Sequence, residues 1–183
     1  MDIFCEEPED RIRLYRIFSS LFINEPSDKQ IIEAAKLFGI TNNETGDEIR
    51  GDYIQLFSNY AGQLLPYESL YNYEITDVPR VWGKATTDVQ KSYRLAGVII
   101  DEELDLVPDH ISAELLFMCY LIENELIEMQ SIFLRNHLCI WVPHFCDDII
   151  DIAMSEFYHQ IAAGLKAFIL SECESFEILT EEL

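Results

Sequence analysis

Residues 108–133 read PDHISAELLFMCYLIENELIEMQSIF, and this stretch decides the fold. Pro108 suits the first turn of a helix, where its missing N–H leaves no hydrogen bond unmade, and Asp109 complements the positive end of the helix dipole. Apolar residues then recur as far as Phe133, too many to lie on one face. We therefore predict that the longest helix begins near Pro108, lies at the centre of the molecule and is buried on most sides.

Helical periodicity also dominates the rest of the chain. Apolar residues at steps of three and four predict further helices over residues 9–22, 27–38, 49–57, 87–97, 145–153 and 155–172. Ser27 with Gln30, and Thr87 with Gln90, have the spacing of a capping box, and Gly39 can adopt the left-handed conformation that ends a helix. Pro143 is expected to interrupt the pattern. Residues 58–85, rich in aromatic side chains, predict a long ordered connection with one short helix after Pro66.

Length and composition favour a single domain. The chain has 183 residues, of which 49% are hydrophobic and 12% aromatic, enough to build a core and to exclude disorder of the whole chain. We predict an all-α fold, a single globular helical bundle over residues 1–183. Its halves, residues 1–100 and 101–173, pack together, and residues 174–183 fray.

Charge restricts the possible partners. Thirty-four acidic side chains face twelve basic ones, a net charge of −22, and residues 95–183 hold only two of the basic ones. Such a surface repels nucleic-acid phosphates and anionic lipid headgroups, so we expect no nucleic-acid partner and no direct membrane insertion. It attracts cationic ligands, although acidity also serves solubility alone.

The compartment is inferred from absent signals. The N-terminal residues have neither the basic nor the apolar region of a secretory signal, and the longest apolar run, Leu115 to Ile122, is far too short to span a bilayer. Five cysteines without regular spacing do not form a disulfide framework. These features predict a cytoplasmic, reduced protein.

No motif in the sequence specifies an enzyme, a metal or a cofactor. His137, Cys139, His144 and Cys146 could ligate zinc, but the residues between them are apolar, so the two cysteines are better explained as small buried side chains. Glu156-x-x-His159 lacks the second half of a di-iron site. Phosphate-binding loops and nucleophile elbows are absent from the sequence. His110 and Glu114, one turn apart, are expected to cap the helix or to accept a cationic ligand.

Four segments resemble one family in their order along the chain. They are Tyr53-x-x-Leu56-Phe57, Pro66-Tyr-Glu-Ser-x-Tyr71, Pro108-Asp-His-Ile-x-x-Glu114-Leu-x-Phe-Met118, and His137-Leu-x-x-Trp141-x-Pro-x-Phe145 with Phe157-Tyr158 downstream. This pattern is similar to that of the TorD/DmsD/NarJ group of redox enzyme maturation chaperones over roughly residues 10–170. One departure is Tyr53, where some members have tryptophan.

The resemblance implies a non-enzymatic, cytoplasmic chaperone for a molybdenum-containing reductase. Such a chaperone binds the twin-arginine signal peptide or N-terminal region of the apo-form catalytic subunit until the cofactor is inserted. Carried over residue by residue, the peptide-binding positions are Leu56, Phe57, Gly83, Pro108, Asp109, His110 and Glu114. Leu56 and Phe57 also lie on an apolar stripe and Pro108 can be a helix starter, so these three have structural explanations as well. Asp109 and His110 are the better candidates for peptide contact, because polar residues on a loop beside an unusually acidic surface have less reason to be structural.

Two other classes of protein are compatible with the sequence. A generic acidic helical adaptor for another basic or amphipathic segment explains the charge equally well, and an enzyme or metalloprotein comes third. Binding of peptides that lack paired arginines would favour the adaptor. The sequence is compatible with either a monomer or a homodimer.

Overall fold

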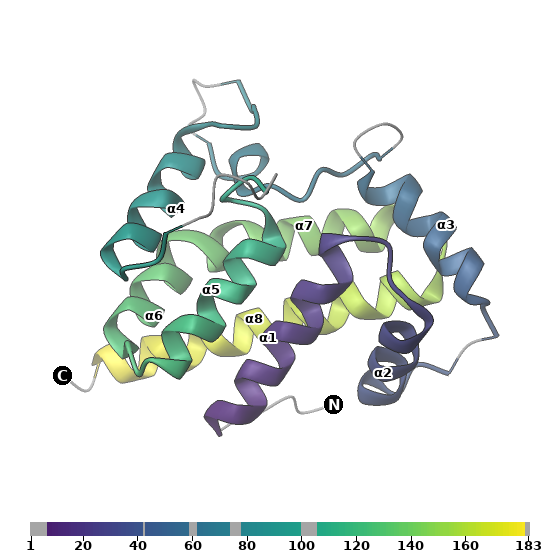
Figure 1. Cartoon of the computed structure of the whole chain (residues 1–183), viewed down its shortest axis with the longest axis horizontal. Helices are drawn as coiled ribbons and strands as arrows, with labels where there is room; N and C mark the ends of the chain where they lie inside the picture. Colours follow the sequence, from purple (N-terminus) through teal and green to yellow (C-terminus); the bar gives the residue numbers. More distant parts are fainter. Residues whose placement is uncertain (1–6, 42, 59–61, 74–77, 100–105, 182–183) are drawn as a thin grey trace.

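The prediction of an all-α fold is confirmed by the computed structural model (Figure 1). The structure describes residues 7–41, 43–58, 62–73, 78–99 and 106–181, so the acidic residues 101–105 lie outside the described part. Within these ranges there is no β-strand, and only Tyr67 and His110 form an isolated bridge.

The described chain is a succession of α-helices, together with one short 3-10 helix and one short π-helix. The elements are α1 (Pro8–Ile23), α2 (Asp28–Phe38), α3 (Gly46–Phe57), the 3-10 turn η1 (Glu68–Leu70), α4 (Lys84–Leu95), α5 (Ile111–Glu123), α6 (Ile127–Phe133), the π-helical η2 (Leu134–Leu138), α7 (Cys139–Ile152) and α8 (Glu156–Glu181). Ser27 and Gln30 form the predicted capping box, and Gly39 ends α2 at φ 66°. The short helix expected after Pro66 is η1.

The prediction of one long helix over residues 108–133 is wrong. Its apolar pattern is divided between α5 and α6, because the chain turns at Asn124 and Glu125. At this turn Glu125 has φ 56°, and the N–H of Leu126 donates to the carbonyl of Leu121 at 2.9 Å. The longest helix is instead α8, with 26 residues. Burial is as expected for most of α5, but Leu116 is 44% exposed.

Three other helix boundaries differ from the predictions. α4 begins at Lys84 with Gly83 as N-cap, so Thr87 lies inside the helix, where burial of Ala85 and Thr86 favours the earlier start. Pro143 lies inside α7 as its fifth residue. The hydrogen bond that Pro143 cannot make would run to Cys139 at the start of α7, next to the wider π-helical turn η2. α8 continues to Glu181, past the point where we expected fraying.

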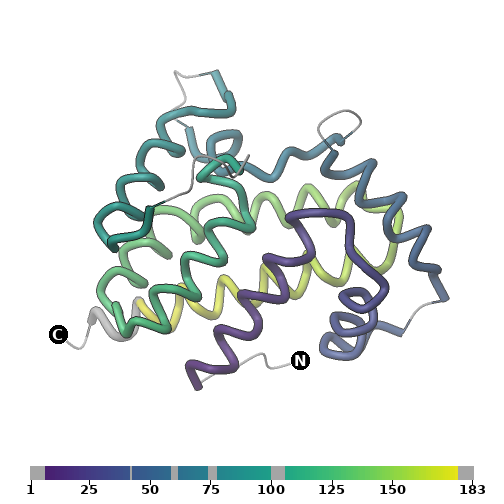
Figure 2. Tube along the Cα trace, in the orientation of Figure 1, coloured from purple at the N-terminus to yellow at the C-terminus, as the bar shows by residue number. Residues whose placement is uncertain are grey.

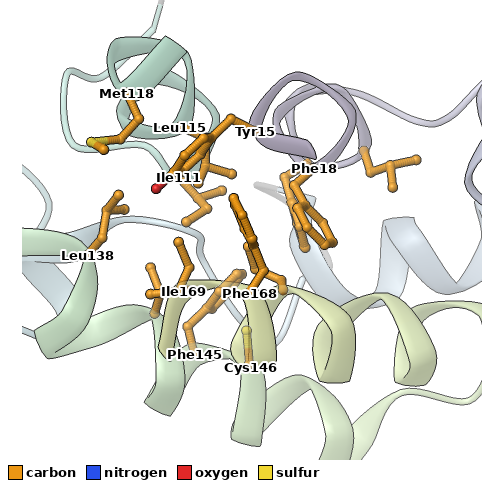
Figure 3. Packing of buried hydrophobic residues seen from close by; sticks show 14 of the residues in the cluster. Tyr15, Phe18, Ile111, Leu115, Met118, Leu138, Phe145, Cys146, Phe168 and Ile169 are labelled. Carbon is orange, nitrogen blue, oxygen red and sulfur yellow. The ribbon is translucent and has the colours of Figure 1, made fainter. Parts of the chain in front are cut away.

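The core lies between two layers of helices. α1 packs on α5, α7 packs on α8, and the first pair crosses in front of the second (Figure 2). Side chains from both layers meet between them, as the close view shows (Figure 3). Phe168 of α8 lies 4.7 Å from the ring of Tyr15 and 5.9 Å from that of Phe18, both on α1.

α1 and α8 are joined by a partly buried ion pair. The guanidinium of Arg11 donates to the carboxylate of Glu172 from Nε at 2.9 Å, although the two residues are 161 positions apart. The hydroxyl of Tyr15 donates to the same carboxylate at 2.9 Å. Phe176 is buried beside Arg11, with the guanidinium 5.5 Å from the ring centre. These contacts hold α8 in place beyond residue 174.

Candidate functional site

The Pro108–His110 segment is bonded through its backbone to the chain before η1. The N–H of Glu68 donates to the carbonyl of Asp109 at 2.9 Å, and the N–H of Ile111 donates to the carbonyl of Pro66 at 2.9 Å. The carboxylate of Asp109 also accepts from the N–H of Ser69 at 2.9 Å. Asp109 is completely buried, so the expectation that it has little structural reason to be there is wrong. It holds the two segments together.

His110 is the N-cap of α5. Its Nδ1 accepts from the N–H of Ser112 at 3.1 Å, and its ring lies edge-on to Tyr67 at 5.3 Å. The imidazole is buried, which lowers its pKa to about 4, although the charge of Asp109 acts in the opposite direction. The capping role expected for this cluster is thus taken by His110. Pro108 and Asp109 lie before the helix, not in its first turn.

Glu114 lies one turn further along α5 and is also completely buried. Its carboxyl group accepts from Nε1 of Trp141 on α7 at 3.0 Å. Burial raises its pKa well above the ordinary value of 4.5, and the neighbouring carboxyl group of Glu68 raises it further. Burial thus favours the protonated form of the Glu114 carboxyl group, because its raised pKa disfavours the charged form.

Glu68 connects this cluster to the end of the π-helical turn. Its carboxylate lies 2.9 Å from Nδ1 of His137 and accepts from the amide of Asn72 at 2.6 Å. Sequence reasoning did not assign Glu68, His137 or Trp141 to the site. All three lie in the segments that carry the family resemblance. That resemblance was the signal that could have assigned them to the site. We call Glu68, Asp109, His110, Glu114 and His137 the polar joint, because together they join η1, α5 and η2.

Leu56 and Phe57 are core residues. Both are buried at the end of α3, as their apolar stripe suggested. The ring of Phe57 lies 5.5 Å from Phe22, 6.0 Å from Phe145 and 5.5 Å from Tyr158. Among the described residues, the hydrogen bonds and ring contacts of this pair go to other parts of the core and not to the polar joint.

Gly83, another predicted site residue, lines an open groove. A Cβ at Gly83 would lie 3.1 Å from the carbonyl oxygen of Arg80 and 3.3 Å from the Cβ of Ser69, so the position is tight for a larger residue. The groove has a volume of about 880 Å³ and lies between α4 and the η2–α7 junction. His137 reaches its floor, so the polar joint lies directly behind the groove.

A serine, a histidine and a carboxylate follow one another here as in the catalytic triad of a hydrolase, namely Ser92, His137 and Glu68. The surroundings of the serine do not support catalysis. The hydroxyl of Ser92 stands 3.5 Å from Nε2 of His137 and donates to the carbonyl of Asp88 at 3.2 Å. Ser92 lies inside α4, where backbone N–H groups bond to carbonyls one turn earlier and cannot stabilise an oxyanion. The groove therefore has the properties of a binding surface.

The cysteines depart from the expected reduced state. Cys139 and Cys173 form a disulfide between α7 and α8, so Cys139 is not the free buried side chain that we predicted. Their Cα atoms, 34 positions apart in sequence, lie 6.3 Å from each other once the helices pair. Cys146 is free and buried, as predicted. Among the described residues, no group of three or more histidine, cysteine or acidic residues could hold a metal ion.

Comparisons with known proteins agree with the resemblance. The family described as nitrate reductase delta subunit matches residues 23–147, more than half of the chain. A chaperone protein TorD from Vibrio parahaemolyticus is 28% identical over 87% of this chain and 91% of its own length. The corresponding chaperone from Vibrio cholerae serotype O1 (strain ATCC 39541) is 26% identical over 74% and 65%, and that of Shewanella piezotolerans is 23% identical over 86% and 76%.

The chain belongs to the TorD/NarJ family of redox enzyme maturation chaperones. Members of this family are chaperones and not enzymes. None of the helices in the described ranges has the length and apolar character needed to cross a membrane.

Proposed function

We propose that this protein is a cytoplasmic chaperone for the assembly of a molybdenum-containing reductase. It binds the twin-arginine signal peptide or N-terminal region of the apo-form catalytic subunit until the cofactor is inserted and the subunit is exported. The observation that carries the proposal is the family match over residues 23–147, together with chaperone relatives aligned along most of the chain.

The charge of the protein supports a cationic ligand. α7 exposes Asp147, Asp148 and Asp151, the turn after α5 exposes Glu125, and the first turn of α6 exposes Glu128. These carboxylates contribute to the net charge of −16 over residues 95–183. A peptide with paired arginines is attracted to such a surface over about a Debye length.

In this proposal, the seven predicted peptide-binding residues act mainly by determining the shape of the surface that the peptide contacts. Asp109, His110 and Glu114 are buried and fix the polar joint, and Leu56 and Phe57 fill the core beside α3. Gly83 lines the groove, at a position where a Cβ would approach the carbonyl oxygen of Arg80. In this proposal, the peptide contacts the surface that these residues position.

Titration calorimetry with synthetic peptides tests the proposal. A twin-arginine signal peptide should bind, a version with both arginines replaced by alanine should bind much more weakly, and salt should weaken the complex. A version with paired lysines keeps the charge but loses the planar, forked guanidinium groups. Equal binding of the arginine, lysine and alanine peptides would favour a generic helical adaptor over a signal-peptide chaperone.

A further inference from the structure

The disulfide between Cys139 and Cys173 has one end beside the groove. Cys139 is the first residue of α7 and directly follows the π-helical η2. Two residues close to it in sequence, His137 and Ile140, line the groove. Cys173, the other end of the disulfide, lies on α8. The disulfide therefore ties one wall of the groove to the longest helix of the molecule.

The backbone around Cys139 lacks part of the regular helical hydrogen bonding. Pro143 has no N–H, so the carbonyl of Cys139 has no helical donor four positions later. On the other side of Cys139, η2 has the wider hydrogen-bonded turn of a π-helix, a rare conformation that is found mostly at functional sites. The disulfide thus constrains a stretch of helix that its own backbone holds less firmly.

The other end of the disulfide is held by contacts of its own. Glu172, next to Cys173, accepts from the guanidinium of Arg11 at 2.9 Å and from the hydroxyl of Tyr15 at 2.9 Å. Phe176, one turn further along α8, is buried. These contacts with α1 remain when the disulfide is broken. Breaking it should therefore free the η2–α7 junction and leave α8 in place.

The sulfur atoms of this pair differ from the other thiols in the described part of the chain. Cys119 and Cys146 are free and buried, and burial raises the pKa of both thiols above the ordinary value of 9.0, that of Cys119 to about 11. Since the thiolate is the form that attacks a disulfide, these two thiols are inert. Cys139 and Cys173 are only partly buried, so a reductant in solution can reach them.

Disulfides are rare in the cytosol, and those of mesophilic proteins are usually transient and catalytic or redox-sensing. We infer that Cys139 and Cys173 form a redox switch, in which the disulfide fixes the groove wall at the η2–α7 junction and reduction releases it. The inference rests on the proposed function for the compartment alone. It adds a means of regulation that the family match does not supply.

Reduction proceeds by exchange with a dithiol. A thiolate of the dithiol attacks one of the two sulfur atoms, which breaks the bond between Cys139 and Cys173 and forms a mixed disulfide. The second thiol of the reductant then displaces the protein sulfur and closes a disulfide within the reductant. Two electrons and two protons pass from the dithiol to the protein, which is left with two thiols. Dithiothreitol is the dithiol used in the tests below.

Thiol labelling tests whether the folded protein undergoes this exchange. The C5S variant is used, because Cys5 lies outside the described residues. Folded C5S protein treated with dithiothreitol and then with a maleimide should gain two labels, on Cys139 and Cys173, as mass spectrometry of its peptides would show. Oxidised glutathione added before the maleimide should prevent this labelling. Labelling of the pair only in unfolding concentrations of urea would identify a permanent structural disulfide and overturn the inference.

Hydrogen exchange locates the part of the molecule that is released. In the reduced protein the amides of residues 134–141 should exchange about tenfold faster than in the oxidised protein, which corresponds to only part of the stabilisation that a cross-link provides. The amides of residues 165–172 should change by less than about twofold, because Glu172 stays bonded to Arg11. Equal exchange of residues 134–141 in the two states overturns the inference.

Matched variants in the C5S background assign the response to this pair. C139S/C173S should show the fast exchange of the reduced protein and should not respond to dithiothreitol. C146A removes a buried thiol from the same helix and should respond as its parent does. A C146A protein that no longer responds would place the exchange at Cys146 and overturn the inference. None of these measurements uses a client peptide, so their failure leaves the proposed function standing, and a failure of peptide binding leaves the switch standing.

Discussion

The aromatic core and the polar joint are both buried, but they do different things for the molecule. The core around Phe57 and Phe168 consists mainly of rings and aliphatic side chains, and burial raises the pKa of a core tyrosine such as Tyr15 well above its ordinary value of 10.0, so the core carries no charge near neutral pH. The polar joint buries three carboxyl groups and two imidazoles where η1, α5 and η2 meet. The core contributes stability, whereas the polar joint fixes the specific arrangement of η1, α5 and η2. The stability of that arrangement depends on the protonation of the side chains in the joint. Four predictions test this division, from the largest expected effect to the smallest.

Removing an aromatic ring from the core should have the largest effect. Phe57→Ala loses the contacts with Phe22, Phe145 and Tyr158 and leaves a cavity, which should lower the free energy of unfolding by about 3–5 kcal/mol. Urea unfolding at several pH values should give the same loss at each. If Phe57→Ala is instead stable but fails to bind the signal peptide, Phe57 is a contact residue.

Loss of the disulfide should act like loss of core packing. Cys139–Cys173 closes a loop of about 34 residues between the helices that form the rear layer, and such a cross-link stabilises by roughly 3–4 kcal/mol. Adding a reducing agent should lower the urea midpoint of the wild type to that of C139S/C173S, independently of pH. The double variant itself should not respond to the reductant. An unchanged wild-type midpoint would contradict the prediction.

His110 should make the joint sensitive to acid. Its pKa is lowered to about 4 in the folded protein from an ordinary value of 6.5, so the unfolded chain binds more protons between these values. The free energy of unfolding should therefore fall as the pH drops below 6.5, by about 2 kcal/mol at pH 5. His110→Asn keeps an N-cap acceptor and should remove this dependence. His144→Asn, on the exposed face of α7, is the control and should retain it.

Glu114 should make the opposite contribution, and its replacement should change stability least. Its pKa is raised by burial, so the folded protein keeps a proton that the unfolded chain loses above pH 4.5, and stability falls as the pH rises. Glu114→Gln preserves an acceptor for Trp141 and cannot ionise. The free energy of unfolding of Glu114→Gln should match that of the wild type in acid, and it should fall less than that of the wild type as the pH rises to neutral. An unaltered pH profile in urea unfolding would show that Glu114 is ionised in the folded protein.

Local signals in the sequence predicted the elements that depend on neighbouring residues. The Ser27–Gln30 capping box and the stop at Gly39 each need only a few adjacent positions, and both were predicted correctly. The break at Asn124 was missed because the apolar periodicity continues across it. Thr87 and Gln90 have capping-box spacing, but the burial of Ala85 and Thr86 favours the earlier helix start.

The polar joint could not be predicted in the same way, because its partners are distant in sequence. Glu114 is 27 positions from Trp141, and Glu68 is 69 positions from His137. A buried carboxyl group has no pattern of its own and resembles a solvated one until its partners are known. The family resemblance pointed to segments that contain the polar joint, but it gave Asp109 and His110 as peptide-binding positions and did not predict that they are buried.

The bond between Arg11 and Glu172 has a consequence for how the protein is made. α1 emerges from the ribosome early, but α8, on which it packs, follows about 160 residues later, a delay on the order of ten seconds at ordinary rates of translation. During that interval the apolar face of α1 can pack on α2, on α3 through Phe22 and Phe57, and later on α5, but the part of it that α8 covers has no final partner. Contacts of such high sequence separation also slow folding. The nascent chain therefore completes its rear layer last, and a protein of the chaperone class spends its own synthesis with an uncovered apolar surface.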